Sequence, residues 1–272
     1  MLKLVNAPMQ NFSVQQKTAT ALNQGIEDVH EIVCEHKEDL SSKKFFNEVK
    51  NYFFSGQRKY FFSRKVSNKI FLKDNKELFE GVLNYAIVKH KHEFRDSGYP
   101  YLAHVLSAGF VLARLGLPQE VVNAGILHDS VEHSLNKNQV LNDLYKLSPA
   151  SCFYVFSVSA PDIQDAVERD KCLYDKINFY SQSSNNLFPR VIKCIDSIVN
   201  LYDVQDMSAK DGRSAKSRQL RFLATSRAKI LPFAKEIDSE GVIPIKKSGG
   251  VFSLEDYARE IIGDKLDLIS YR

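Results

Sequence analysis

The sequence HDSVEHS, at residues 128–134, places four titratable side chains within six residues. His128 is followed directly by Asp129, and Glu132 and His133 come one helical turn later. If the stretch is helical, residues three and four apart share a face, so each of the first pair lies beside one of the second. Such a group is costly to bury unless a cation or a charged substrate compensates it. The stretch therefore raises the prospect of a metal site.

Two further segments place ligand-type residues within apolar helical patterns. Asp196 lies in VIKCIDSIVNLYDV, where a narrow polar stripe at spacings of 3, 4 and 3 is formed by Lys193, Asp196, Asn200 and Asp203. His104 lies in PYLAHVLSAGFVLARLG, which has few other polar side chains. Taken alone, either residue is more often a structural residue with a hydrogen-bond partner than a ligand.

The three signals support one another because they come from three successive apolar helical segments. Together they supply two imidazoles and two carboxylates, from His104, His128, Asp129 and Asp196. This mixed nitrogen and oxygen set suits Mn²⁺, Fe²⁺ or Zn²⁺, and the absence of a thiolate argues against a structural zinc site. We therefore predict that these four side chains converge on one divalent metal ion.

Three motifs in order extend this pattern. They are H-x4-R-x-S-G-x-P-Y-x-x-H at residues 90–104, H-D-x-x-E at 128–132 and K-x-x-D-x-x-x-N at 193–200. With these motifs, residues 77–205 resemble the hydrolase half of the bifunctional alarmone enzymes of the Rel and SpoT type, and their small single-domain relatives. An H-D pair alone is a weak signal, but the ordered set is a strong one.

The resemblance implies an all-α HD-type phosphohydrolase that binds one Mn²⁺ through His104, His128, Asp129 and Asp196. The substrates of that family are guanosine tetra- and pentaphosphate, the alarmones of the stringent response, from which the 3′-pyrophosphate is removed. Animal relatives also remove the 2′-phosphate of NADPH. A bound divalent cation suits this chemistry because it lowers the pKa of water and offsets phosphate charge.

By motif position, the resemblance also assigns roles around the four ligands. Arg95 matches the arginine that lies against the nucleotide base, and Asn200 matches the asparagine near the ribose and phosphate. Glu132 matches the first residue of a catalytic Glu-Asp pair, where it could orient the attacking water or take its proton. Lys193 could offset phosphate charge, or it could equally be a helix-cap or interface lysine.

The sequence departs from the family pattern at positions that bear on substrate and activity. His133 replaces the second acid; it can act as an acid or base near neutral pH but supplies no second carboxylate. Asp96 replaces a lysine where an anionic substrate is expected. Two alternatives therefore stay open: a degenerate protein that binds a nucleotide or protein partner without turnover, and an HD phosphohydrolase for another nucleotide such as NADPH. His90 and His92 are expected to be exposed.

The elements that must position these residues are predicted to be helices, because glycine and proline are sparse and apolar residues recur mostly three and four apart. We predict an all-α HD-domain helical bundle with an N-terminal helical extension over 1–70, the HD domain over 71–235, and a C-terminal helical tail over 236–272 that packs on it. Residues 117–133 are predicted as one helix, and 148–161 as a connector that could contain a short helix.

Composition bounds the class of protein. The chain is 44% hydrophobic and 26% charged, with a net charge of +4 that by itself does not indicate nucleic-acid binding. No apolar run approaches the roughly 20 residues of a membrane span, and the start lacks the apolar stretch of a secretory signal. The four cysteines show no C-x-x-C spacing, which favours reduced thiols. We expect a cytoplasmic protein with a small-molecule nucleotide substrate, no nucleic-acid partner and no membrane association.

Residues 41–80 carry ten Lys or Arg against four acids and are crowded with Phe and Tyr. Basic residues interleaved with aromatics could stack nucleobases. The recurrence of FF, YFF and YFF at seven-to-eight-residue spacing is more typical of helices that bury one face and expose a basic back. This basic aromatic region could also contact a partner or a second copy of the chain.

Overall fold

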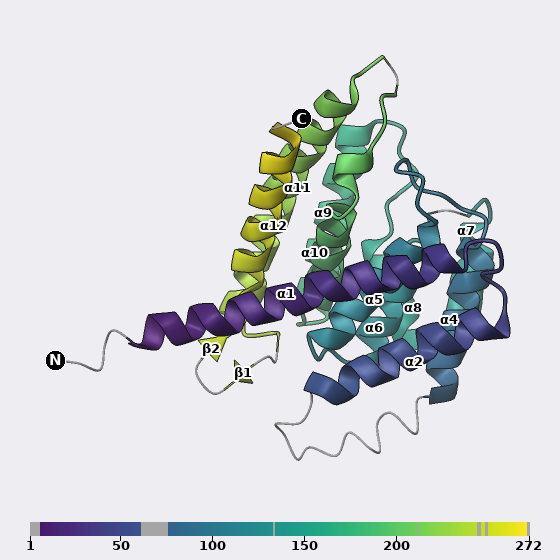
Figure 1. Cartoon of the computed structure of the whole chain (residues 1–272). Helices are drawn as coiled ribbons and strands as arrows, with labels where there is room; N and C mark the ends of the chain where they lie inside the picture. Colours follow the sequence, from purple (N-terminus) through teal and green to yellow (C-terminus); the bar gives the residue numbers. More distant parts are fainter. Residues whose placement is uncertain are drawn as a thin grey trace.

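The computed structural model describes residues 6–60, 76–132, 134–210, 212–243, 246–247 and 250–270. The fold is all-α, as predicted (Figure 1). Apart from isolated bridges, the β-structure in these ranges is limited to two strands of two residues each. The two strands pair antiparallel, with Lys246 opposite Val251. The elements are α1 (Asn6–Glu35), α2 (Lys43–Tyr60), α4 (Lys76–His90), α5 (Tyr101–Arg114), α6 (Gln119–Leu127), α7 (Lys137–Leu147), α8 (Pro149–Val158), α9 (Ala166–Ser183), α10 (Phe188–Asn200), the 3₁₀-helix η1 (Val204–Asp206), α11 (Ala215–Ser239), β1 (Lys246–Lys247), β2 (Gly250–Val251) and α12 (Leu254–Ser270).

Helix α5 lies at the centre of the bundle. Its sequence, YLAHVLSAGFVLAR, carries no residue of fixed charge before Arg114, and every position from Leu102 to Ala113 is buried. Helices α1, α6 and α10 all pack against it. A helix that is apolar on all sides belongs in the interior, because each face can then exclude water. His104, in the first turns of α5, is thereby held in the interior.

Helix α10 turns its polar stripe inward, toward α5 and α6. Its apolar residues Val191, Ile195 and Ile198 are buried, but so are Asp196 and, just beyond its end, Asp203. A stripe of polar residues on an amphipathic helix usually faces solvent. Here it faces other polar side chains, which places the polar residues in a site between helices.

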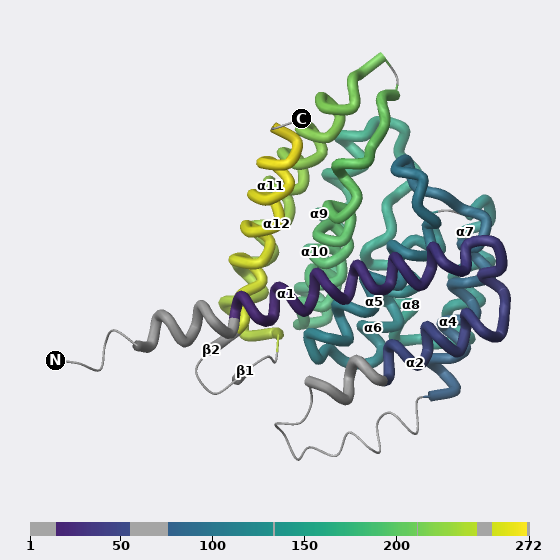
Figure 2. The backbone as a smooth tube through the Cα atoms, in the orientation of Figure 1, coloured from purple at the N-terminus to yellow at the C-terminus, as the bar shows by residue number. Residues whose placement is uncertain are grey.

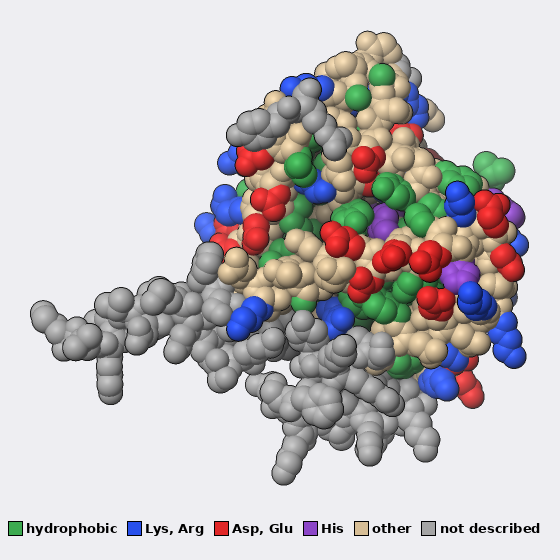
Figure 3. All heavy atoms as spheres, in the orientation of Figure 1, with side chains coloured by type: hydrophobic (Ala, Val, Ile, Leu, Met, Phe, Trp, Pro, Cys, Tyr) green, Lys and Arg blue, Asp and Glu red, His purple; other side chains and the backbone are tan. Residues whose placement is uncertain are grey.

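Helix α1 runs across the bundle and packs against α5 (Figures 1 and 2). Its outer face carries the exposed acids Glu27, Glu31 and Glu35, part of the row of acidic side chains over this helix in Figure 3. Its inner face approaches α5 so closely that a Cβ atom on Gly25 would lie 2.0 Å from Cε1 of Phe110. Glycine at this position therefore allows the two helices to touch.

The basic aromatic region is described only in part. Helix α2 buries Phe45, Val49 and Phe53 at four-residue spacing, as expected of a helix with one apolar face. The third aromatic group, at 60–62, lies mostly outside the described residues. A partner or self-association surface on this region stays a prediction. No helix among the described residues has the length and apolarity that a membrane crossing requires.

Three expectations about the elements were wrong or incomplete. Residues 149–158 are a regular, largely buried helix, α8, which fills most of the segment expected to be a connector with a possible short helix; its apolar residues lie on all sides and leave no one-face periodicity to detect. Helix α7 was not predicted at all. Helix α6 ends at Leu127, and residues 128–132 form turns, so the helical pairing expected across HDSVEHS does not hold.

The buried hydrophobic residues form one cluster that extends from Ala19 to Ile269. Helix α12 packs along α11, and the strand β2 contacts α1 (Figure 1). The division into an extension, a central domain and a tail stays a prediction, since the core is continuous across all three predicted parts.

His30 connects α1 to residues beside the polar stripe. Its ring is buried, with ring centroids 5.3 Å from Tyr99 and 4.6 Å from Tyr202. Burial lowers the pKa of His30 to about 4, and the nearby carboxylate of Asp203 offsets part of that effect. The folded protein therefore holds a neutral imidazole between the two tyrosines.

We expect Gly25→Ala to destabilise the protein by about 1–3 kcal/mol, the usual cost of adding a methyl group to a filled interface. Phe110 cannot move freely, because its ring is stacked on Tyr52 and lies edge-on to Phe53. Urea unfolding measures the change. The control is Gly263→Ala in α12, where a Cβ meets nothing within 4 Å; it should stabilise by about 0.5–1 kcal/mol. Equal stability of wild type and Gly25→Ala would show that α1 does not pack on α5.

His30 should make stability fall on acidification. The unfolded-state pKa is about 6.5 and the folded one is lower, so the unfolded chain binds the proton more readily and unfolding becomes easier as pH falls from about 6.5 to 4. The full effect is up to about 3 kcal/mol. His30→Phe should lose this part of the pH dependence, whereas substitution of the exposed His92 by Phe should keep it. Parallel stability–pH curves for wild type and His30→Phe would contradict the assignment.

Candidate metal centre

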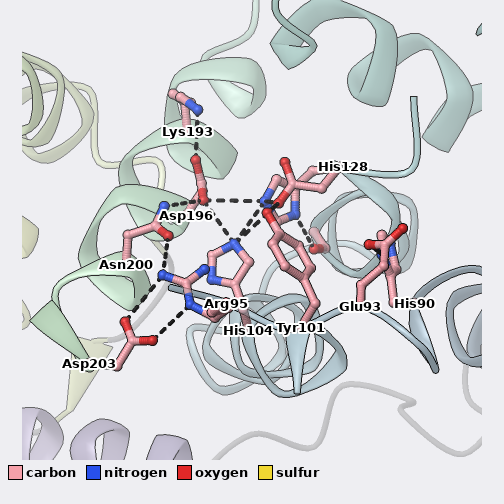
Figure 4. A network of polar contacts seen from close by, with 12 residues as sticks. His90, Glu93, Arg95, Tyr101, His104, His128, Lys193, Asp196, Asn200 and Asp203 are labelled. Atoms are coloured by element: carbon pink, nitrogen blue, oxygen red, sulfur yellow. Dashed lines mark hydrogen bonds and ion pairs between the residues drawn. The ribbon is translucent and has the colours of Figure 1, made fainter. Parts of the chain in front are cut away.

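The structure brings together the four side chains predicted as metal ligands. His104 comes from α5, His128 and Asp129 from the turn after α6, and Asp196 from α10, and all four are buried (Figure 4). Nε2 of His104 lies 3.2 Å from Nε2 of His128 and 3.2 Å from Oδ1 of Asp196. Oδ2 of Asp129 lies 3.4 Å from the first nitrogen and 3.0 Å from the second. The four atoms surround one small volume.

These separations match the edges of a coordination polyhedron. With bonds of about 2.1 Å, the length found for nitrogen and oxygen ligands of zinc, neighbouring ligands in tetrahedral or octahedral sites lie about 3.0–3.4 Å apart. Nε2 of His128 is also 3.2 Å from Oδ1 of Asp196. One cation placed among these four atoms could bind the lone pairs of both imidazoles and one oxygen of each carboxylate. The donor set therefore fits a divalent metal ion.

Hydrogen bonds outside the centre orient its ligands. Nδ1 of His128 lies 2.8 Å from the carbonyl oxygen of Gly125. A carbonyl only accepts, so Nδ1 carries a proton, and Nε2 is the nitrogen that can bind a cation at the centre. The hydroxyl of Tyr101 donates to Oδ2 of Asp129 at 2.7 Å. Such outer contacts fix the rotamers that metal binding requires.

Asp196 has two polar neighbours on its own helix. Nζ of Lys193 donates to Oδ2 at 2.7 Å, and Nδ2 of Asn200 donates to Oδ1 at 2.7 Å. Burial would raise the pKa of Asp196, but Lys193 and His128 hold it well below its usual range. Burial alone would lower the pKa of Lys193, yet the carboxylates of Asp196 and Glu132 raise it above its ordinary value. Asp196 and Lys193 are therefore both ionised.

The crossing of α5 and α6 is unusually close, which brings the two histidines together. A Cβ atom on Gly109 would lie 2.3 Å from Cγ1 of Ile126, and one on Gly125 would lie 2.2 Å from Cδ1 of Leu112. The two glycines therefore permit the approach of the helix backbones. His104 and His128 lie near this crossing, on facing elements.

A cavity of about 280 Å³ adjoins the centre. It is lined by Phe94, Arg95, Asp96, Ser97, Tyr101, Asn200, Asp203, Met207 and Phe222. Arg95 donates from Nε to Asp203 at 2.8 Å and from Nη2 to Asn200 at 2.9 Å, and its guanidinium carbon lies 5.7 Å from the centre of the Tyr101 ring (Figure 4). Since Asn200 also bonds Asp196, a continuous line of hydrogen bonds joins the cavity to the centre.

Glu132 lies near the centre, but the structure does not include it among the converging ligand atoms. Its Oε1 accepts a hydrogen bond from the backbone N–H of Ala160 at 2.6 Å. Burial, together with the negative charge of Asp129, raises the pKa of Glu132. A carboxyl group of raised pKa can hold or release a proton closer to neutral pH. His133, the other predicted catalytic residue, lies outside the described residues.

Sequence analysis missed three contributors to the site. Tyr101 lies three residues before His104, on the same helical face, and that spacing was the available signal. Asp203 was part of the polar stripe but was given no role, although it anchors Arg95 and accepts a hydrogen bond from Ser97. His90, expected to be exposed, is fully buried: its Nδ1 lies 2.7 Å from Oε2 of Glu93, and its ring stacks on Tyr101.

Comparison with curated proteins finds short matches to Rel/SpoT-type enzymes. The chain is 30% identical over 90 residues to a guanosine-3′,5′-bis(diphosphate) 3′-pyrophosphohydrolase of Haemophilus influenzae. It is 33% identical over 67 residues to a bifunctional (p)ppGpp synthase/hydrolase RelA of Mycobacterium tuberculosis. It is 34% identical over 61 residues to a GTP pyrophosphokinase of Myxococcus xanthus. The matches cover 33%, 25% and 22% of this chain, and 11%, 9% and 8% of the respective relatives. No family model and no solved structure matches the chain. The chain therefore shares a segment of about a tenth of the length of these relatives.

We expect Asp196→Ala to abolish stoichiometric metal binding and to lower the stability of the protein, since it removes one ligand and leaves Lys193 without its buried partner. Elemental analysis of the purified variant measures the first effect. The control is Asp162→Ala, because the side chain of Asp162 is 81% exposed. Metal content equal to wild type in Asp196→Ala would reject the centre as described.

Proposed function

We propose that this protein is a Mn²⁺-dependent nucleotide phosphohydrolase that removes the 3′-pyrophosphate of guanosine tetra- or pentaphosphate. The proposal rests on one observation above all: a buried centre of two histidines and two aspartates opens beside a cavity that carries Arg95 and Asn200. The named relatives, which include a pyrophosphohydrolase for guanosine bis(diphosphate), support the substrate class.

The cavity suits the nucleoside part of such a substrate. Its walls include the apolar side chains of Phe94, Met207 and Phe222. Arg95 is oriented by Asp203 and Asn200, so its charge is already paired, and its planar face remains the feature that a purine can stack on. A base held there places the sugar and its phosphates toward Asn200 and the centre.

At the centre, a bound divalent ion would lower the pKa of water and offset phosphate charge. His104, His128, Asp129 and Asp196 would hold it, and Lys193 keeps Asp196 ionised and oriented. Lys193 also lies close enough to the centre for its charge to favour a phosphate group, which stays a prediction. Glu132 would accept the proton of the attacking water, with Oε1 fixed by Ala160.

A second candidate is a protein that binds the nucleotide without turnover. It is favoured by His133, which stands where the related enzymes have an acid, since an imidazole supplies no second carboxylate. This candidate predicts metal and nucleotide binding with no product. Hydrolysis of NADPH is a further alternative with a distinct product, inorganic phosphate.

The deciding assay incubates the Mn²⁺-loaded protein with guanosine tetraphosphate and, separately, with NADPH, and follows pyrophosphate and phosphate. The proposal predicts pyrophosphate from the first substrate and no phosphate from the second. Phosphate released from NADPH, with no pyrophosphate released from guanosine tetraphosphate, would identify NADPH as the substrate instead. Tight binding of guanosine tetraphosphate with no product would favour the protein without turnover.

Glu132→Gln should keep the metal and lose turnover by about 10²–10⁴-fold, the usual contribution of a general acid–base group. The amide keeps the shape of the side chain and an oxygen for the N–H of Ala160, but it cannot take a proton. Rates with saturating Mn²⁺ and metal content are measured on the same preparation. Normal turnover in this variant would remove Glu132 from the mechanism.

A further inference from the structure

The cavity beside the metal centre is built from two parts of the chain that are far apart in sequence. One wall is the loop of residues 94–97, between α4 and α5. The other includes Met207, after η1, and Phe222, on α11. The shape of the cavity therefore depends on what holds the loop against the segment from η1 to α11.

One set of contacts anchors the loop at the end of α10. Arg95 pairs with Asp203 through two nitrogens, at 2.8 and 3.1 Å, and the hydroxyl of Ser97 donates to the same carboxylate. These contacts fix the inner side of the loop, near the metal centre. They do not reach Met207 or Phe222.

Asp96 makes a second connection, to α11. Its Oδ2 accepts a hydrogen bond from Nη2 of Arg218 at 2.7 Å, and its Oδ1 accepts one from Nζ of Lys210 at 3.3 Å. Arg218 also donates from Nη1 to the carbonyl oxygen of Ser208 at 2.5 Å. Side-chain exposure is 45% for Asp96 and 14% for Arg218, so Arg218 is the more buried member of the pair.

The wall itself is fastened to α11 beside this contact. Nε2 of Gln219 donates to the carbonyl oxygens of Gln205 and Met207, at 3.0 and 3.3 Å. The neighbouring residue Arg218 holds Ser208 in the same way. The stretch 205–208 is therefore hydrogen-bonded to the first turns of α11, and Asp96 connects both to the loop.

We propose that Asp96 is a positioning residue: with Arg218 and Lys210 it latches the 94–97 loop to the start of α11 and so fixes the apolar wall of the nucleotide cavity. The inference rests on the proposed function only where it says that the cavity holds the nucleoside. The latch gives the carboxylate at position 96 a structural role. Two cations already neutralise this carboxylate, so it does not repel an anionic substrate.

The test exchanges the charges of Asp96 and Arg218, the two residues that face each other in the latch. Asp96→Arg places three cations together, and Arg218→Asp places two acids together, so each alone should open the latch. The double variant Asp96→Arg/Arg218→Asp restores an opposite-charge pair of the same two lengths. Coupling of this kind is the signature of a direct contact. The control is Arg259→Glu, which reverses a charge in the exposed pair Arg259–Glu255 of α12.

Two readouts are taken on each variant. Steady-state kinetics with guanosine tetraphosphate should show KM raised about three- to tenfold in the single variants with kcat little changed, the scale of losing one partly exposed ion pair and adding a like-charge contact. Hydrogen–deuterium exchange should become faster over residues 94–101 and 205–222. The double variant should return both quantities toward wild type, and the control should change neither.

The outcomes separate the latch from the proposed function. Exchange that rises in the single variants and recovers in the double one supports the latch, even if the wild-type protein shows no turnover and the proposed function fails. Unchanged exchange in all variants overturns it. A lower KM in Asp96→Arg, with unchanged exchange, also overturns it and instead places position 96 against a substrate phosphate.

Discussion

The structure depends on the burial of ionised carboxylates at the point where α5, α6 and α10 meet. Asp129 and Asp196 are both buried, and the neighbouring histidines and Lys193 hold their pKa values well below the usual range, although burial alone would raise them. Such charges are tolerated inside a protein only when compensating charge lies at contact distance. Either a proton held on His128 or a metal ion can supply that charge, so metal binding at this centre would be coupled to the release of a proton.

The same constraint organises the surroundings. Asn200 bonds both Asp196 and Arg95, so the predicted metal ligand Asp196 and the wall of the cavity share one amide group. Asp203 accepts a hydrogen bond from Arg95, and the neighbouring residue Tyr202 contacts the buried His30 of α1. Through these contacts the N-terminal helix supports the loop that borders the cavity. Helix α1 therefore helps to hold the site in shape.

The clustering of His104, His128, Asp129 and Asp196 could be predicted from sequence because charged residues inside apolar helical segments have few structural explanations. The fold class followed from periodicity. Two kinds of feature could not be predicted: the exact ends of helices, and contacts between residues far apart in the sequence. Helix α6 ends at Leu127 because the chain then forms turns, and the sequence pattern does not mark that change. Helix α8 is apolar on all sides, so it shows no one-face periodicity. The partner of Asp96 is 122 residues away, so its charge looked unfavourable until the fold placed Arg218 beside it.

The measurement that tests the central claim most directly is an anomalous-difference map from a crystal of the full chain grown with Mn²⁺. The account predicts one strong peak about 2.0–2.2 Å from Nε2 of His104 and of His128 and from a carboxylate oxygen of Asp129 and of Asp196, the distances of a divalent metal to nitrogen and oxygen ligands. A map with no peak there, and with the histidines bonded directly to the carboxylates, would contradict it.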